Sequence, residues 1–211
     1  MNFKEEIAKK LLEIDAISLT TPDQLFTWAS GIKSPIYCDN RLVMSYPAIR
    51  DMVADALKDL VQMHYPDVNL LVGTATAGIP HAAWTAQKMN LPMAYVRSNP
   101  KEHGKGNKIE GRVQKGDRVV VIEDLLSTGG SSIKVVNALK EVGADVLGIA
   151  AIFTYGFSEM DEKFKNEKIP YFTVTDYKTL IAVARKGGRI SEEEEKILSI
   201  WSENPTMFTD I

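Results

Sequence analysis

Apolar residues along the chain follow two spacings, one typical of helices and the other of buried strands. Spacing of three and four residues predicts amphipathic helices over about 3–14 and 47–64, and Ser45 is placed to cap the second. Short apolar runs without alternation predict strands buried on both faces, at 67–72, 93–96, 119–122, 145–153 and 171–174. Because helical patterns separate most of these runs, we expect an α/β fold with a central, mostly parallel sheet flanked by helices.

The two ends of the chain depart from this alternation. Residues 26–28 and 36–38 are predicted to be short strands on either side of a turn at 30–35. Since such a hairpin has little core of its own, we expect a small hood, mainly 17–40, over a core of about 45–185, within a single domain spanning 1–211. The tail from Ser191, SEEEEKILSIWSE, predicts a capped helix with acidic residues in its first turn.

The segment 118–132, RVVVIEDLLSTGGSS, joins a buried strand to residues suited to bind a ligand. Two carboxylates, Glu123 and Asp124, stand where the strand is expected to end, and small hydroxyl and glycine residues precede a helical pattern. Glycines let backbone N–H groups approach an anion, and a helix N-terminus adds partial positive charge. Carboxylates suit hydroxyl groups, so the segment predicts a ligand with both a phosphate and a diol, such as a sugar phosphate. The alternative is an ordinary strand-to-helix turn.

A second unit of strand, small-residue loop and helix has the same character. Its loop, GTATAG at 73–78, follows a predicted strand, and Pro80 is a residue favoured in the first turn of a helix. Both loops are expected at the carboxyl ends of parallel strands, where ligands of such sheets bind.

The segment between Arg97 and Arg118 breaks the regular pattern, because it is rich in glycine and basic residues and nearly free of apolar ones. A long segment without structure is usually a functional lid or disordered. We expect a flexible, cationic lid over a polyanion, at about 98–117. The alternative for Lys101 and His103 is that they are ordinary solvated loop residues.

Composition narrows the function further. The chain has 211 residues, a formal net charge of −3 and one cysteine. No global field draws such a protein to nucleic acid or to a membrane, and an internal disulfide is excluded. No apolar run reaches the ~20 residues of a membrane span, so we expect a cytoplasmic protein. The chain lacks a P-loop and a complete G-x-G-x-x-G, and His64 and His81 have no metal-ligand spacing, so no metal ligands are assigned.

The segment VVVIEDLLSTGGSS closely resembles the phosphoribosyl-diphosphate signature of type I phosphoribosyltransferases. Together with RSNPKEHG and FTWASGIKSPIYCDNR, it is similar to the orotate phosphoribosyltransferases of the short bacterial kind. The resemblance implies the type I phosphoribosyltransferase fold. It also implies transfer of phosphoribosyl from 5-phospho-α-D-ribose 1-diphosphate to orotate, giving orotidine 5′-monophosphate and diphosphate, in pyrimidine (UMP) synthesis.

The resemblance also implies roles for individual residues. Lys101 and Asp124 are the implied catalytic residues. The implied donor-binding residues are Arg97, Lys101, His103, Glu123, Asp124, Leu125, Leu126, Ser127, Thr128, Gly129, Gly130 and Ser131. The implied diphosphate loop contains Thr74, Thr76 and Ala77. The implied orotate-binding residues are Ser127, Ser30, Gly31 and Lys33.

The same resemblance implies Mg²⁺ that arrives on the substrate, and a homodimer with shared active sites. Arg97, Lys101 and His103 are implied to reach the neighbouring subunit's site. Some relatives have basic residues where Ala29, Ala77 and Ser98 stand here, and some have an arginine near the position of Tyr155. Three alternatives stay open: a purine-base phosphoribosyltransferase, a non-catalytic regulator that senses phosphoribosyl diphosphate and binds nucleic acid, and a plain α/β nucleotide-binding module.

Overall fold

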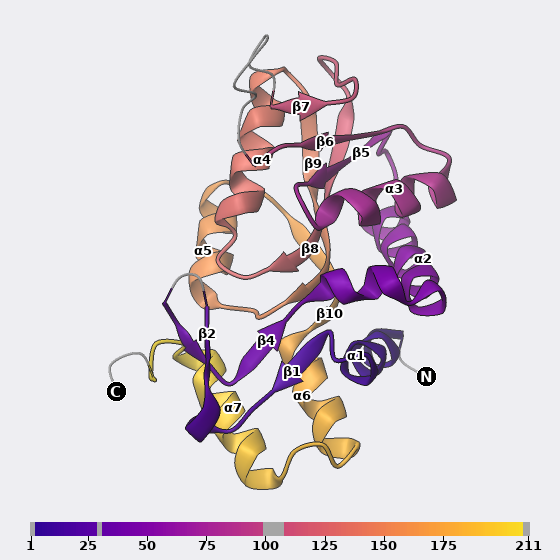
Figure 1. Ribbon diagram of the computed structural model, residues 1–211. Helices are drawn as coiled ribbons and strands as arrows, with labels where there is room; N and C mark the ends of the chain where they lie inside the picture. Colours follow the sequence, from indigo (N-terminus) through magenta and orange to yellow (C-terminus); the bar gives the residue numbers. More distant parts are fainter. Residues whose placement is uncertain (1–2, 29–30, 99–107, 209–211) are drawn as a thin grey trace.

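A six-stranded sheet forms the centre of the computed structural model, which describes residues 3–28, 31–98 and 108–208 (Figure 1). Its strand order is β10-β9-β8-β5-β6-β7. The strands are β5 (Leu70–Thr74), β6 (Met93–Val96), β7 (Ile109–Glu110), β8 (Arg118–Leu126), β9 (Asp145–Thr154) and β10 (Tyr171–Asp176). Neighbouring strands run parallel except for β7, which is antiparallel to β6 at the edge. The predicted mostly parallel sheet is confirmed.

Helices cover both faces of this sheet (Figure 1). One face carries α1 (Phe3–Glu13), α2 (Pro47–His64) and α3 (Gly78–Met89), and the other carries α4 (Gly130–Glu141) and α5 (Ser158–Asn166). After β10, α6 (Tyr177–Lys186) packs on α1, and α7 (Glu192–Glu203) packs on α6. Ser191 caps α7 through a capping box with Glu194, as the tail sequence predicts.

The core lies around the two central apolar runs. Val119 to Ile122 in β8 and Ile149 to Phe153 in β9 are fully buried. Burial of each valine, isoleucine or phenylalanine side chain among them contributes about 1.5–3 kcal/mol relative to exposure. These two strands therefore stabilise the sheet that carries the loops. No helix in the described part of the chain is both long enough and apolar enough to cross a membrane.

The strands of the hood pair differently from the prediction. Strand β2 (Phe26–Thr27) pairs with β3 (Lys33–Ser34), and β4 (Ile36–Cys38) pairs with β1 (Ile17–Leu19). The predicted pairing of 26–28 with 36–38 is therefore wrong. The side chain of Ser34 hydrogen-bonds both the N–H and the carbonyl of Ile36, and this tight turn splits the segment into two strands.

Two short 3₁₀ helices complete the hood region, η1 (Pro22–Gln24) and η2 (Asn40–Ser45). An aromatic cluster joins the hood to the C-terminal part of the chain. It contains Trp28, Tyr155, Phe157, Tyr177 and Trp201. The Trp201 indole also donates a hydrogen bond of 3.3 Å to the Lys33 carbonyl.

Several predicted boundaries are also corrected. Strand β8 does not end at the carboxylate pair but continues through it to Leu126, because β9 pairs with it along that length. Helix α4 begins at Gly130, inside the predicted loop. Ser45 belongs to η2, and α2 instead begins with Pro47 in its first turn after Tyr46.

The predicted structureless lid is wrong at residues 109–110, which form a strand, whereas residues 111–117 have no helix or strand. Ile109 and Glu110 form β7, and Ile109 and Val113 pack against the core. The few apolar residues of this segment therefore suffice to attach it to the sheet edge. Residues 99–107 lie outside the described part of the chain.

Candidate active site

The sheet changes winding direction between β5 and β8. From β5 the chain moves outward to β6, whereas from β8 it moves to β9 and β10 on the other side. Such a switch point opens a crevice beyond the carboxyl ends of its two strands, where ligands bind. Here the loops that follow β5 and β8 flank a cavity of about 450 Å³, named below the switch-point cavity. It is lined by Cys38, Asp39, Arg41, Thr74, Ala75, Thr76, Ala77, Glu123, Asp124, Leu125, Ser127, Thr128, Gly129 and Ser131.

The loop after β8 is the segment in which an anion cradle is predicted. Gly129 precedes α4 with a φ of +76°, and no side chain caps the helix, so its first-turn N–H groups are open to a ligand. A Cβ at Gly129 would lie 3.0 Å from the Phe164 ring in α5, so both the backbone conformation and the packing require glycine there. Small residues thus bring the backbone N–H groups to the cavity.

The carboxylate pair lies at the floor of the cavity. Glu123 is buried, and the Ser132 hydroxyl donates a hydrogen bond of 2.9 Å to its carboxylate. Burial, and next the charge of Asp124, raise the pKa of Glu123. Burial also raises the pKa of the partly buried Asp124. The pair can therefore both accept hydrogen bonds from a diol and retain a proton near neutral pH.

The hood supplies Asp39 and Arg41 to the cavity lining, with Asn40 between them, and none of the three was predicted to have a role. Asn40 is buried and donates a hydrogen bond of 2.6 Å to the Asp124 carbonyl, which ties the hood to the end of β8. Arg41 pairs with Asp39 at 2.8 Å, Nη2 to Oδ2. The sequence signal is the run of polar residues directly after the strand at 36–38, but nothing in the linear order places it against β8.

Cys38 lies at the cavity wall, partly exposed. Burial raises the pKa of its thiol, followed by the charge of Asp124, so the thiol stays protonated near neutral pH. A protonated thiol is a poor nucleophile.

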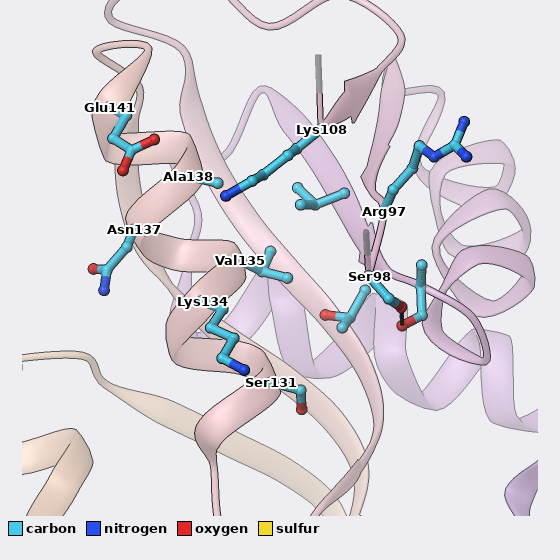
Figure 2. A pocket seen from close by; sticks show the side chains of 12 residues that line it. Arg97, Ser98, Lys108, Ser131, Lys134, Val135, Asn137, Ala138 and Glu141 are labelled. Atoms are coloured by element: carbon cyan, nitrogen blue, oxygen red, sulfur yellow. Dashed lines mark hydrogen bonds between the residues drawn. The ribbon is translucent and has the colours of Figure 1, made fainter. Parts of the chain in front are cut away.

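The loop after β5 forms the opposite wall. Thr74 is buried at the strand end, and the peptide bond between Ala75 and Thr76 is cis. The Ser98 hydroxyl donates a hydrogen bond of 3.3 Å to the Ala75 carbonyl (Figure 2). Position 98 therefore adjoins this loop. The structure brings the predicted residues Thr74, Thr76 and Ala77 to the same cavity as the pair Glu123 and Asp124.

Other predicted site residues lie elsewhere. Leu126 is fully buried, and its carbonyl accepts a hydrogen bond of 3.2 Å from the Thr154 hydroxyl, so its side chain belongs to the core. Gly130 starts α4 but does not line the cavity. Gly31 lies between β2 and β3, and Lys33 is the first residue of β3; neither lines the cavity. The Lys33 ammonium donates to the Thr27 hydroxyl at 2.9 Å.

Of the predicted lid residues, the structure describes Arg97 but not Lys101 or His103. Arg97 pairs with Glu110 at 3.3 Å and lines a neighbouring cavity (Figure 2). Lys101, His103 and Ser30 lie outside the described residues. Over the described ranges, no group of three or more His, Cys, Asp or Glu gathers as a metal site would require.

Comparison with known proteins decides the family. A model of the phosphoribosyl transferase domain matches residues 44–186. The orotate phosphoribosyltransferase of Bacillus caldolyticus is 55% identical over 202 residues, which cover 96% of this chain and 97% of the relative. The chain belongs to the orotate phosphoribosyltransferase family. The resemblance read from the three sequence motifs is thereby confirmed.

Solved orotate phosphoribosyltransferases share the fold of this family member. The enzyme from Aeropyrum pernix has a TM-score of 0.75 and 28% identity, over 88% of this chain and 99% of that one. The UMP synthase of Leishmania donovani has a TM-score of 0.79 and 30% identity, over 94% of this chain and 42% of the other, longer chain. The type I phosphoribosyltransferase fold predicted from the sequence is confirmed.

Proposed function

We infer that this protein transfers the phosphoribosyl group of 5-phospho-α-D-ribose 1-diphosphate to orotate, giving orotidine 5′-monophosphate and diphosphate for pyrimidine (UMP) synthesis. One observation carries the inference beyond family membership. The switch-point cavity joins an anion cradle, a carboxylate pair and a second small-residue loop, and these match the phosphate, the ribose diol and the diphosphate of the donor.

The reaction requires little covalent help from the protein. The bond from the anomeric carbon to the diphosphate oxygen breaks, and its electron pair leaves with diphosphate. A new bond forms from that carbon to a ring nitrogen of orotate, whose proton passes to solvent. The sugar gains oxocarbenium character, as in glycoside hydrolysis, so stabilisation of charge is the main need.

Residues of the cavity divide this work. Glu123 and Asp124 hold the ribose hydroxyls, while the loop of Ser127 to Ser131 wraps the 5′-phosphate with its N–H groups. Asn40 fixes the position of the Asp124 backbone. On the other wall the loop of Thr74 to Ala77 faces the diphosphate.

Magnesium is proposed to arrive on the donor. The cavity lining offers the carboxylate oxygens of Asp39, Glu123 and Asp124, which are the kind of ligand that Mg²⁺ takes together with phosphate oxygens and water. When bound, the ion neutralises charge on the diphosphate oxygens.

A homodimer with shared active sites is also part of the proposal. Tyr37, Leu42, Met44 and Tyr46 are large apolar side chains that are each about 40% exposed, and they flank the hood residues of the cavity. Such a gathering is typical of a protein interface. An interface beside the cavity would allow Arg97, Lys101 and His103 to reach the neighbouring subunit's donor.

The acceptor is proposed to bind under the hood. Ser127 lies in the cavity, and Ser30, Gly31 and Lys33 are proposed to bind orotate from the hood. Tyr155 lies in the aromatic cluster that supports this turn, at the position near which some relatives carry an arginine. Backbone N–H groups of the turn are therefore proposed to bind more of the orotate here. The net charge of −3 supports the absence of a nucleic-acid partner, and the single cysteine supports a cytoplasmic location.

The decisive experiment measures diphosphate release from phosphoribosyl diphosphate. We expect release that depends on both orotate and Mg²⁺, in a competition in which uracil, hypoxanthine and adenine are each offered alongside orotate. Preference for hypoxanthine or adenine would replace the acceptor assignment with a purine base. Tight donor binding without release for any base would favour the non-catalytic regulator.

A further inference from the structure

A second cavity, of about 430 Å³, lies between the edge of the sheet and α4 (Figure 2). It adjoins the switch-point cavity, because Thr74, Ala75 and Ser131 line both. Lys108 extends toward α4 from the strand side, and Lys134 extends from α4 beside Ser131 (Figure 2). The two ammonium groups therefore belong to opposite walls of one groove, which we name the lysine groove.

The charge of the lysine groove is not neutralised by its own side chains. Glu141 is the one carboxylate among its described lining residues, against Arg97, Lys108 and Lys134. Arg97 is already paired with Glu110. Within the described residues, neither lysine forms an ion pair with a carboxylate, so both remain available to an anionic ligand.

In the switch-point cavity, acidic side chains outnumber basic ones. Its described lining contains three carboxylates, Asp39, Glu123 and Asp124, and one cation, Arg41, which is paired with Asp39. The cradle N–H groups serve the 5′-phosphate, but the loop from Thr74 to Ala77 has only neutral side chains. The diphosphate end of the donor therefore lacks a cation on that loop, and the lysine groove begins at the same loop.

We propose that Lys108 and Lys134 form the subsite that receives the diphosphate leaving group. This inference rests on the proposed transferase function and adds two binding residues to it. As the anomeric carbon–oxygen bond breaks, the electron pair stays on the diphosphate oxygen, and the two ammonium groups stabilise the added charge. The groove then gives the product a route away from the ribose without passing the carboxylate pair.

The reverse reaction tests the subsite, because orotidine 5′-monophosphate and diphosphate then bind as separate substrates. We expect Lys108→Ala and Lys134→Ala each to raise the KM for diphosphate about threefold, and the double variant about tenfold, since exposed charge pairs contribute modestly. The KM for orotidine 5′-monophosphate should stay within about twofold. Lys134→Arg should restore most of the diphosphate affinity, because it keeps the charge.

Lys140→Ala is the matched control, since Lys140 lies on the exposed side of the same helix, outside the lysine groove. It should leave both KM values unchanged. A diphosphate KM that stays within twofold of wild type in the double variant would overturn the inference. A rise confined to the KM for orotidine 5′-monophosphate would also overturn it, and would assign Lys134 to the 5′-phosphate instead. Either result in an active wild type leaves the transferase function intact, whereas a wild type without orotate-dependent turnover would remove that function itself.

Discussion

Glu123 links donor binding to the pH dependence of stability. Its buried side chain accepts a hydrogen bond from Ser132, and burial raises its pKa above the ordinary value. Between the two pKa values the folded chain holds a proton that the unfolded chain has lost, so stability falls as pH rises through that window. Glu123→Gln removes the titrating carboxyl, and with it this pH dependence, but keeps an acceptor for the Ser132 hydroxyl.

We therefore compare the free energy of unfolding of Glu123→Gln with that of wild type at two pH values. The difference, variant minus wild type, should be at least ~1 kcal/mol larger at pH 8 than at pH 5. Denaturant unfolding at both pH values measures this difference. The exposed Glu162→Gln on α5 is the control and should change both values equally. Equal changes for Glu123→Gln as well would show that its carboxyl is already ionised at pH 5 in the fold.

For single residues, the sequence identifies the members of a contiguous motif better than the residues that contact the motif only in the folded structure. The glycines, hydroxyls and acidic pair of 123–131 are adjacent in the chain, so their order alone suggests a ligand site. Asn40 and Lys134 reach the same region only because the hood folds over β8 and because α4 turns back along the sheet. No local pattern encodes such contacts, so neither residue was predicted to belong to the site.

Helix α3 crosses β8 so closely that its first residue must be glycine. A Cβ at Gly78 would lie 2.5 Å from the Ile122 carbonyl oxygen, which is backbone and cannot rotate away. We expect Gly78→Ala to lower the free energy of unfolding by about 1–3 kcal/mol through overpacking. Gly130→Ala is the control, because a Cβ there meets nothing within 4 Å. Thermal or denaturant unfolding of the two variants should differ, and equal stability would contradict the close crossing.

Helix α7 is expected to hold the acceptor turn of the hood. Trp201 is fully buried, and its indole N–H donates to the Lys33 carbonyl. Trp201→Phe keeps an aromatic ring but loses this hydrogen bond, which costs about 1 kcal/mol. We expect the KM for orotate to rise severalfold while the KM for the donor stays unchanged, as measured by steady-state kinetics.

Tyr177→Phe is the matched control for α7. Tyr177 belongs to the same aromatic cluster, and its hydroxyl donates a hydrogen bond of 2.9 Å to the Leu198 carbonyl, away from the hood turn. It should lose a similar amount of stability with no change in the KM for orotate. Parallel kinetic changes in both variants would mean that the cluster acts through general stability alone.

Helices and strands were predicted correctly where their own residues determine them, and wrongly where distant contacts do. Unbroken apolar runs predicted the central strands, since burial on both faces leaves a signal in every residue. The hood pairing was mispredicted, because the turn made by the Ser34 side chain competes with the longer hairpin. Strand β7 was missed because two residues that pair only through β6 carry almost no periodicity.

At the scale of the whole molecule, the proposed dimer makes each active site depend on two chains. Asp124 lines the switch-point cavity of its own chain, whereas Lys101 is proposed to act on the neighbouring one. Separately, Lys101→Ala should reduce turnover at least ~100-fold without loss of stability, because one positioned cation contributes ~3–4 kcal/mol to the transition state. Asp124→Asn should reduce both donor affinity and turnover.

Mixing the two inactive variants tests the sharing directly. In a hybrid dimer, the Lys101→Ala chain keeps its own Asp124 and receives an intact Lys101 from the Asp124→Asn chain, so one of its two sites is complete. Random reassociation makes half of the dimers hybrid, and activity should return to about a quarter of wild type. The regained activity should rise with the time allowed for subunit exchange. If Lys101 acts within its own chain, every site in the mixture lacks one group, and no activity returns.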